Sequence, residues 1–318
     1  MSVPRVSVIL PTYNRASLLL RALTSVLDQT YESYEVRIVD DGSTDNTRLV
    51  VAGLADQRLH YERIDHAGSA VARNHAVRTA RGEWLAFIDS DDEWMPTKLE
   101  RQLGVAATLP PEIGVIYCGG EYVDDTTSRP VATRRLRPGR DVRVFDRLLE
   151  TNWFPFVSVL IHRRCFERVG LFDEGLACGE DREWLLRVAR SFDFYGLADP
   201  LVRVHIHRGQ RQTTSLAERI AFAEAILRRY AEELARRPAL RARKYVALGQ
   251  LQLHHADPAA ARRAFMMALR TRPAFLPAYF HLLTSWGLWP GWHAISRLRQ
   301  RRRGRRSLAQ VGGQRTAP

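Results

Sequence analysis

The apolar and polar positions at the start of the chain follow an alternating pattern of predicted strands and helices. Four short segments have the character of strands: residues 5–10, 35–39, 58–62 and 84–88. The segments between them carry apolar side chains at helical spacing: residues 15–28, 44–55 and 69–80. Strands that alternate with helices in this way favour a parallel sheet with helices on both faces. We therefore predict an α/β fold with a mostly parallel sheet.

Acidic side chains directly follow two of the predicted strands. Asp40 and Asp41 follow the second strand. Asp89, Asp91 and Asp92 follow the fourth. The carboxyl ends of parallel strands lie along one edge of a sheet, where open α/β sheets bind ligands. Crowded carboxylates repel each other unless a cation or protons offset their charge, and Mg²⁺ or Mn²⁺ takes such oxygen ligands, so the pattern predicts one crevice that holds a divalent cation.

Both groups of acids also have a structural interpretation. Asp41 followed by Gly42 is a common turn sequence. An aspartate after a strand can also cap the next helix. Either group, taken alone, leaves this alternative open.

The length and composition are those of a soluble globular protein with one large domain and an appendage. The chain has 318 residues, of which 45% are hydrophobic and 26% are charged. Its three cysteines are an odd number without metal-ligand spacing, so we expect reduced thiols and a cytoplasmic protein. The N-terminus lacks a charged-then-apolar signal, and no apolar run is long enough for a clear membrane span.

The net charge of +13 is concentrated near the C-terminus, where seven arginines fall between residues 297 and 306. A basic tail of this kind can bind nucleic acid, anionic lipid or nothing specific. Because no recognised nucleic-acid motif accompanies the charge, we expect no nucleic-acid partner. We predict that residues 297–318 form a disordered tail.

Helical periodicity dominates the chain beyond residue 212. Residues 242–273 look like one tetratricopeptide-type helix pair, with small side chains at the helix contact and a closing proline. We therefore predict a helical appendage over residues 213–296. Its last part, residues 274–296, crowds aromatic and aliphatic side chains next to the arginine tail. The segment 274–306 is thus suited to peripheral binding on an anionic, cytoplasmic membrane surface, and ordinary core packing is an equal alternative.

Five sequence segments follow one another in a fixed order: Val6–Arg15, Ile38–Asp45, Gly68–Asn74, Gly82–Asp92 and Gly179–Arg187. Together they cover about residues 3–210, and they resemble family 2 glycosyltransferases, which have the nucleotide-sugar-binding GT-A fold. The resemblance implies a catalytic domain over residues 1–212, with a nucleotide-binding half over 1–95 and an acceptor-side half over 96–212. It implies transfer of a sugar from a nucleoside-diphosphate sugar, normally a UDP-sugar, to a hydroxyl of a saccharide or lipid-linked acceptor. Such a reaction belongs to the synthesis of surface polysaccharide or glycoconjugate.

The resemblance also assigns roles at the nucleotide. Pro11, Thr12 and Tyr13 would lie beside the base and the ribose. Asp41 resembles the acid that hydrogen-bonds the base, which is normally uracil. Arg73 matches the residue that reaches the nucleotide or the diphosphate.

A metal ion, Mn²⁺ or Mg²⁺, is assigned by the resemblance to the acids after the fourth strand. Asp89 and Asp91 look like the metal-binding pair, and Asp92 lies close to the donor sugar. His207 sits roughly where relatives place a histidine near the metal and diphosphate, and His205 is an equal candidate. A cation across the diphosphate would stabilise the charge that the leaving group gains in the transition state.

The catalytic candidates are Glu180 and Asp181. Asp181 resembles the family's catalytic base, with Glu180 as its neighbour. A carboxylate that takes the acceptor's proton contributes about 10²–10⁴ in rate. One displacement with one base predicts inversion at the anomeric carbon. The alternative is a structural role, because acids at a helix N-terminus interact favourably with the helix dipole.

Residues 129–143 combine arginines with prolines and a glycine, which is typical of a loop. Such a loop could cover the donor diphosphate or admit an anionic acceptor, and a solvated surface loop is the simpler alternative.

Two other function classes remain open at this point. A metal-dependent nucleotidyltransferase also uses an α/β nucleotide fold, but it usually has a glycine-rich turn where this chain has Pro11–Asn14. A non-catalytic scaffold built on a degenerate transferase is the other class. The presence of all the expected acids argues against it.

Overall fold

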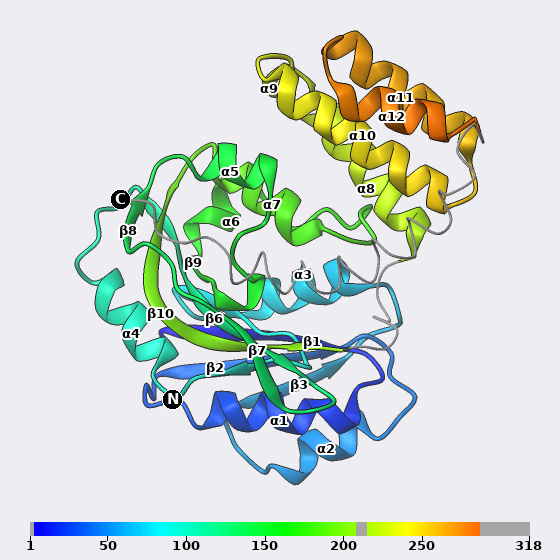
Figure 1. The fold of residues 1–318 in the computed structure, drawn as a ribbon. Helices are drawn as coiled ribbons and strands as arrows, with labels where there is room; N and C mark the ends of the chain where they lie inside the picture. The colour runs from blue at the N-terminus through cyan, green and yellow to red at the C-terminus, as the bar shows by residue number, and fades with distance from the viewer. Residues whose placement is uncertain (1–2, 208–214, 287–318) are drawn as a thin grey trace. The chain divides into compact units, whose positions relative to one another are not determined.

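The structure is a computed structural model, and it describes residues 3–207 and 215–286. The described residues form two compact units. The first unit contains the residues up to 207, apart from Leu176–Gly179, and it is an α/β unit (Figure 1). The second contains Leu176–Gly179 and the described residues from 215 onward, and its regular elements are helices. None of the helices within these ranges combines the length and apolarity needed to cross a bilayer.

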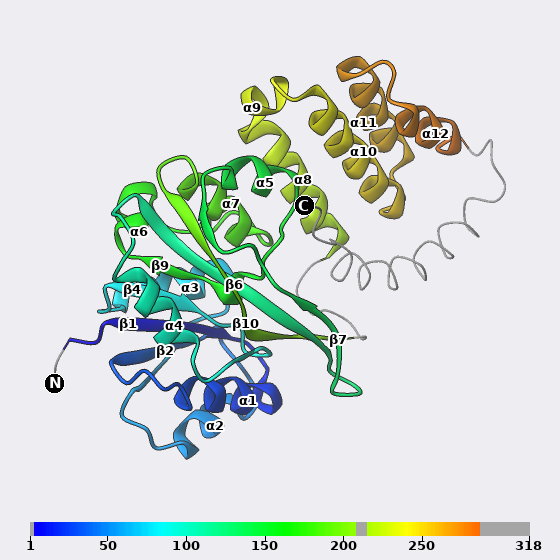
Figure 2. The ribbon, with the colours of Figure 1, turned by 60° about the vertical axis from the view of Figure 1, so that its left-hand side comes forward.

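A mixed β-sheet forms the centre of the first unit (Figures 1 and 2). Its ten strands are β1 (Val6–Thr12), β2 (Tyr34–Asp40), β3 (Leu59–Arg63), β4 (Trp84–Phe87), β5 (Glu93–Trp94), β6 (Ile113–Asp124), β7 (Arg129–Arg134), β8 (Gly139–Asp141), β9 (Leu160–His162) and β10 (Asp193–Ile206). The order across the sheet is β3-β2-β1-β4-β9-β6-β10-β5, with β7 paired to β6 and β8 paired to β10.

The long strands of the sheet run parallel, and short antiparallel strands interrupt or flank them. β1 pairs in parallel with β2 and β4, and β2 pairs in parallel with β3. Beyond β4, the short strand β9 runs antiparallel to both of its neighbours, β4 and β6. Strand β10 in turn pairs in parallel with β6. The predicted α/β fold is therefore confirmed, and parallel pairs occur on both sides of β9.

Helices cover both faces of this sheet. Their bounds are α1 (Ala16–Leu27), α2 (Thr47–Gly53), α3 (Ser69–Thr79), α4 (Lys98–Ala106), α5 (Val144–Glu150), α6 (Arg164–Val169) and α7 (Glu180–Val188). Helices α1, α2 and α4 pack on one face through a core that includes Leu23, Val51 and Leu99. Helix α3 packs on the opposite face (Figure 2). Alternating side chains of β1 serve the two faces, because successive residues of a strand point to opposite sides.

Helix α7 is anchored by an aromatic cluster. The ring of Trp184 is fully buried and stacks on Phe166, with ring centroids 4.2 Å apart. Its indole Nε1 donates a hydrogen bond of 2.8 Å to the carbonyl oxygen of Gly170. Phe172 also lies against Trp184, with centroids 5.3 Å apart. These contacts fix the N-terminus of α7, where the predicted catalytic acids lie.

The predicted loop over residues 129–143 is wrong for most of its length. Residues Arg129–Arg134 form β7, which pairs antiparallel with β6, and Gly139–Asp141 form β8 against β10. Pro130 is compatible with β7 because this short strand lies outside the main strand order, where a missing amide hydrogen is tolerated.

The second unit is a helical bundle. Its helices are α8 (Leu216–Arg229), α9 (Ala231–Ala235), α10 (Pro238–His254), α11 (Pro258–Thr271) and α12 (Leu276–Thr284). The predicted helix pair corresponds to α10 and α11, which pack around buried Phe265. A Cβ on Gly249 would lie 2.5 Å from the Phe265 ring, so a small residue is required at this contact. The predicted arginine tail and residues 287–296 lie outside the described residues.

Candidate active site

The acid at the end of β2 is held by the main chain. The amide of Asp41 donates to the carbonyl oxygen of Thr12 at 2.9 Å, which ties the end of β2 to the end of β1. One carboxylate oxygen of Asp41 accepts from the amide of Ala67 at 2.8 Å and the other from the amide of Gly68 at 2.9 Å. Gly68 has a φ of +97°, which favours glycine at the start of α3. The two amides before α3 therefore hold the Asp41 carboxylate in one orientation.

An aromatic pair lies next to Asp41. The rings of Tyr13 and His66 stack with centroids 4.1 Å apart and an interplanar angle of 17°. His66 Nδ1 lies 2.9 Å from Asp41 Oδ2. Thr12 Oγ1 is buried and has no hydrogen-bond partner among the described residues. Pro11 lies one residue earlier on β1, opposite Val39 of β2.

Arg73 links the end of β4 to the start of α7. Its guanidinium is buried, with Nη2 donating to Asp89 Oδ1 at 2.8 Å and Nη1 donating to Glu180 Oε1. Ser69 Oγ also donates to Glu180 Oε1, at 2.6 Å. One arginine of α3 thus brings together acids that lie 91 positions apart in the sequence, from Asp89 to Glu180.

Asp181 is the next residue of α7. Burial, with the negative charge of Glu180, raises the pKa of Asp181 to about 6, although the charge of Arg73 acts in the opposite direction. Asp181 Oδ1 accepts a hydrogen bond of 2.7 Å from the amide of Arg182. A carboxyl group with a raised pKa near neutrality is suited to accept a proton.

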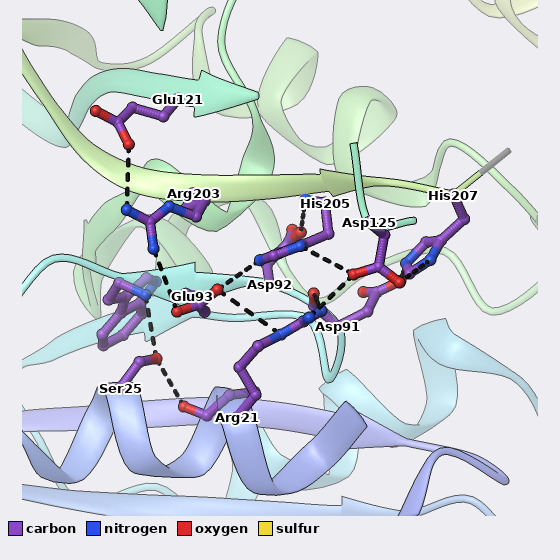
Figure 3. A network of polar contacts seen from close by, with 12 residues as sticks. Arg21, Ser25, Asp91, Asp92, Glu93, Glu121, Asp125, Arg203, His205 and His207 are labelled. Carbon is purple, nitrogen blue, oxygen red and sulfur yellow. Dashed lines mark hydrogen bonds and ion pairs between the residues drawn. The ribbon is translucent and has the colours of Figure 1, made fainter. Parts of the chain in front are cut away.

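The structure distinguishes the two candidate histidines (Figure 3). His207 Nε2 lies 3.1 Å from Asp91 Oδ2, and the same oxygen accepts from the guanidinium of Arg15. His205 contacts a different acid: its Nε2 lies 2.5 Å from Glu93 Oε1. His207, not His205, is therefore the histidine beside Asp91.

Asp92 lies beneath the turn that carries Asp91. It is buried, and its Oδ1 accepts a hydrogen bond of 3.0 Å from the amide of His205. Burial, with the charges of Asp91 and Asp89, raises the pKa of Asp92 well above its usual value. Repulsion among these three carboxylates disfavours their ionised forms, and a bound cation would offset it.

We use the name acid cluster for the five acids at this edge of the sheet: Asp89, Asp91, Asp92, Glu180 and Asp181. Sequence reasoning missed several residues that contact the acid cluster, Asp41 or the two candidate histidines: Arg15, His66, Glu93 and Asp125. Arg15 and His66 lie in or beside the recognised segments, so proximity to those segments was a usable signal. Nothing in the sequence marks Asp125, because its place depends on how β6 pairs with β10.

The side chains around Asp91 fit a divalent cation in part. Two neighbouring ligands of an octahedral ion at about 2.1 Å lie about 3.0 Å apart. The separation of Asp91 Oδ2 and His207 Nε2, 3.1 Å, matches this value. Within residues 3–207 and 215–286, no three His, Cys, Asp or Glu side chains form a metal site by themselves. The fit is therefore to an ion that takes its remaining ligands from a phosphate-bearing substrate and water, as Mg²⁺ commonly does.

Acids lie at the carboxyl ends of β2 and β4, the edge where open α/β sheets bind their ligands. A family model described as glycosyl transferase family 2 matches residues 7–174, more than half of the chain. The chain belongs to this family and is a glycosyltransferase, which sets aside the nucleotidyltransferase and scaffold alternatives.

Curated relatives include two proteins of Escherichia coli. The chain is 32% identical over 227 residues to the putative colanic acid biosynthesis glycosyl transferase WcaA of strain K12, which covers 67% of this chain and 76% of the relative. It is 35% identical over 165 residues to UDP-Glc:alpha-D-GlcNAc-diphosphoundecaprenol beta-1,3-glucosyltransferase WfgD, which covers 48% of this chain and 64% of the relative.

Two solved structures are similar to this chain. TarS 1-349 of S. aureus, in complex with UDP-GlcNAc, has a TM-score of 0.61 at 18% identity and covers 89% of each chain. The mannosyltransferase PcManGT of Pyrobaculum calidifontis, in complex with GDP-Man and Mn²⁺, has a TM-score of 0.51 at 25% identity. That alignment covers 90% of this chain and 80% of the other. The likeness to TarS supports the GT-A fold predicted from the sequence.

Proposed function

We propose that the protein is a metal-dependent, inverting glycosyltransferase that moves a sugar from a nucleoside-diphosphate sugar to a hydroxyl acceptor. The observation that carries this proposal is the pair of bonds made by Arg73, which joins Asp89 after β4 to Glu180 beside Asp181. The buried guanidinium of Arg73 thus connects a residue proposed for the donor side to the residues proposed for the acceptor side.

The donor end of the proposed site is the region around Asp41. Its carboxylate is oriented by two main-chain amides and would accept a hydrogen bond from the base, while Tyr13 and the unpartnered hydroxyl of Thr12 lie beside it. Uracil offers a ring N–H donor to such an acid, and we propose a UDP-sugar as the donor. TarS binds UDP-GlcNAc and PcManGT binds GDP-Man, which supports a nucleotide sugar and leaves the base to experiment.

Asp91 and His207 are the residues proposed to hold a divalent cation, with Asp89 beside them. When bound, Mn²⁺ or Mg²⁺ would offset the charge of the diphosphate leaving group. Mn²⁺ is present in the PcManGT complex, which supports this choice. The guanidinium of Arg15 contacts the same Asp91 oxygen that faces His207, so Arg15 must yield this oxygen when a metal binds.

Asp181 is the proposed base. It would accept the proton that the acceptor hydroxyl loses during attack on the anomeric carbon, and Glu180 would hold Arg73 in place next to it. A single in-line displacement inverts the anomeric centre, so an α-linked donor would yield a β-linked product.

The acceptor is proposed to be a saccharide, free or lipid-linked. WcaA is named for colanic acid biosynthesis and WfgD for transfer to a diphosphoundecaprenol-linked sugar, and both names support a role in polysaccharide assembly. Helix α12 and the turn after it expose apolar side chains: Leu276, Tyr279, Leu283 and Trp286. Such side chains support peripheral attachment to an anionic membrane surface through residues 274–306.

A thermal-shift series with UDP, GDP and their sugars, each with and without Mn²⁺, tests the proposed donor and metal together. We expect UDP to raise the melting temperature of the wild-type protein only when Mn²⁺ is present, and we expect Asp91→Asn to lose this increase. Asp199→Asn is the matched control, because Asp199 pairs with Arg101 on the surface. Equal stabilisation of wild type and Asp91→Asn would exclude Asp91 as a ligand.

A further inference from the structure

Asp125 occupies a central place in the polar network of Figure 3. It follows the last residue of β6, and its amide donates to the carbonyl oxygen of Ile206 at 3.2 Å, which ties it to the end of β10. Both carboxylate oxygens face histidines of this strand end. Oδ1 lies 3.0 Å from His205 Nδ1, and Oδ2 lies 3.1 Å from His207 Nδ1.

The imidazole of His207 is thus placed between two carboxylates. Its Nδ1 faces Asp125 and its Nε2 faces Asp91, each at 3.1 Å. In a neutral imidazole one nitrogen carries the proton and the other offers a lone pair. A carboxylate beside Nδ1 favours the proton on that nitrogen and leaves the lone pair of Nε2 directed at the Asp91 side.

Arg21 holds Asp125 in this position. Its Nη1 donates to Asp125 Oδ1 at 2.9 Å, and its Nη2 donates to the main-chain carbonyl oxygen of Asp91, also at 2.9 Å. One guanidinium of α1 therefore connects Asp125 to the turn that carries Asp91. Glu93 lies on the opposite side of His205, so His205 and His207 each have an acid at both ring nitrogens.

We propose that Asp125 is a positioning residue that sets the tautomer and ring orientation of His207 for a divalent cation beside Asp91. This proposal depends on the metal dependence proposed above. Carboxylates that contact the far nitrogen of a metal-binding histidine typically change metal affinity by about 10–100-fold when they are removed.

Binding of Mn²⁺ in the presence of UDP, followed by the electron paramagnetic resonance signal of free Mn²⁺, tests the proposal. Asp125→Asn is expected to weaken Mn²⁺ binding by about 10–100-fold. The matched control is Glu121→Gln, because Glu121 lies on β6, the strand that Asp125 follows, and contacts Arg203, 3.4 Å away, rather than a histidine. Unchanged Mn²⁺ affinity in Asp125→Asn would overturn the proposal. A wild-type protein that does not bind Mn²⁺ would instead defeat the proposed metal dependence.

A double-mutant cycle with His207→Ala separates the proposed role from general damage. If Asp125 acts through His207, Asp125→Asn should have little further effect on Mn²⁺ affinity in the His207→Ala background. An equal loss in both backgrounds would show another route and would refute the proposal.

A spectroscopic measurement on the wild-type protein needs no variant. In the diamagnetic Mg²⁺–UDP complex, ¹⁵N NMR of the imidazoles should find the His207 proton on Nδ1. A proton on Nε2 in that complex would also refute the proposal.

Discussion

The carboxylate at the end of β2 and the carboxylates after β4 are held in different ways. Asp41 is buried and both of its oxygens accept hydrogen bonds from main-chain amides. Asp89 and Asp91 instead pair with the side chains of Arg73 and Arg15. Main-chain donors are fixed by the fold, whereas a guanidinium on a long side chain can release one partner and take another. The Asp41 carboxylate is therefore held in one orientation, whereas Asp89 and Asp91 could exchange an arginine for another cation.

Replacing Asp181 with asparagine is expected to have the largest effect and to act on the acid cluster alone. Transfer should fall by about 10²–10⁴-fold, because the amide cannot accept the acceptor's proton in place of the carboxylate. Donor binding should persist, since the contacts of Asp41 are untouched. Measuring kcat and the Kd for UDP with Mn²⁺ on the same preparation checks both statements. Loss of donor binding with an unchanged kcat would reverse the assignment, and Asp199→Asn again serves as the control.

The pH dependence of the transfer rate should also report on Asp181, with a smaller change in kcat. Burial, with the charge of Glu180, raises the pKa of Asp181 to about 6, so the base is ionised above pH 6 and protonated below it. At a saturating donor concentration, kcat should therefore fall about fivefold between pH 6 and pH 5, because the ionised fraction of the base falls from about one half to about one tenth. The residual activity of Asp181→Asn should lack this dependence. A wild-type profile that is flat down to pH 5 would rule out a base with this pKa.

The smallest expected effect comes from disturbing the β2 end through its backbone. Gly42 has a φ of +82°, and a Cβ there would lie 2.9 Å from the amide nitrogen of His66. Gly42→Ala should cost about 1–2 kcal/mol of unfolding free energy, because L residues are strained in a left-handed conformation. The substitution should also weaken UDP binding, because it would displace His66 from its position beside Asp41. Urea unfolding and calorimetry would measure the two effects.

Gly104→Ala is the control for this substitution. Gly104 lies within α4, and nothing lies within 4 Å of a Cβ built on it. Alanine at this position should raise the unfolding free energy by about 0.5–1 kcal/mol and leave UDP affinity unchanged. If both variants lost stability equally, the positive φ of Gly42 would not be the cause.

The first half of the fold could be predicted from the sequence because its order is local. Strands β1, β2 and β3 are each followed by a helix, and the predicted segments 35–39 and 69–80 lie within one residue of β2 and α3 at each end. The second half resisted prediction because strands such as β9 have three residues and obtain their stability from partners distant in the chain. No local pattern distinguishes such a strand from a turn.

The site was predictable to the extent that it lies in recognised segments. The spacing of acids after β2 and β4 led to Asp41 and Asp91, and the structure places both at the ends of these strands. Asp125 and the choice between His205 and His207 were not predictable, because they depend on the register of β6 against β10. Arg15 was overlooked since its neighbour Asn14 suggested only a helix cap.

The long strand β10 has a consequence for how this protein tolerates insertions and deletions. Its pairing with β6 is irregular between Leu197 and Val202, where Pro200 interrupts the register. His205 and His207 lie downstream, two positions apart, and so they project from the same side of the strand. Deleting one residue between Val202 and His205 would turn both imidazoles to the other face of the sheet. The chain length between Val202 and His207 therefore matters as much to the proposed metal site as the identity of residue 207.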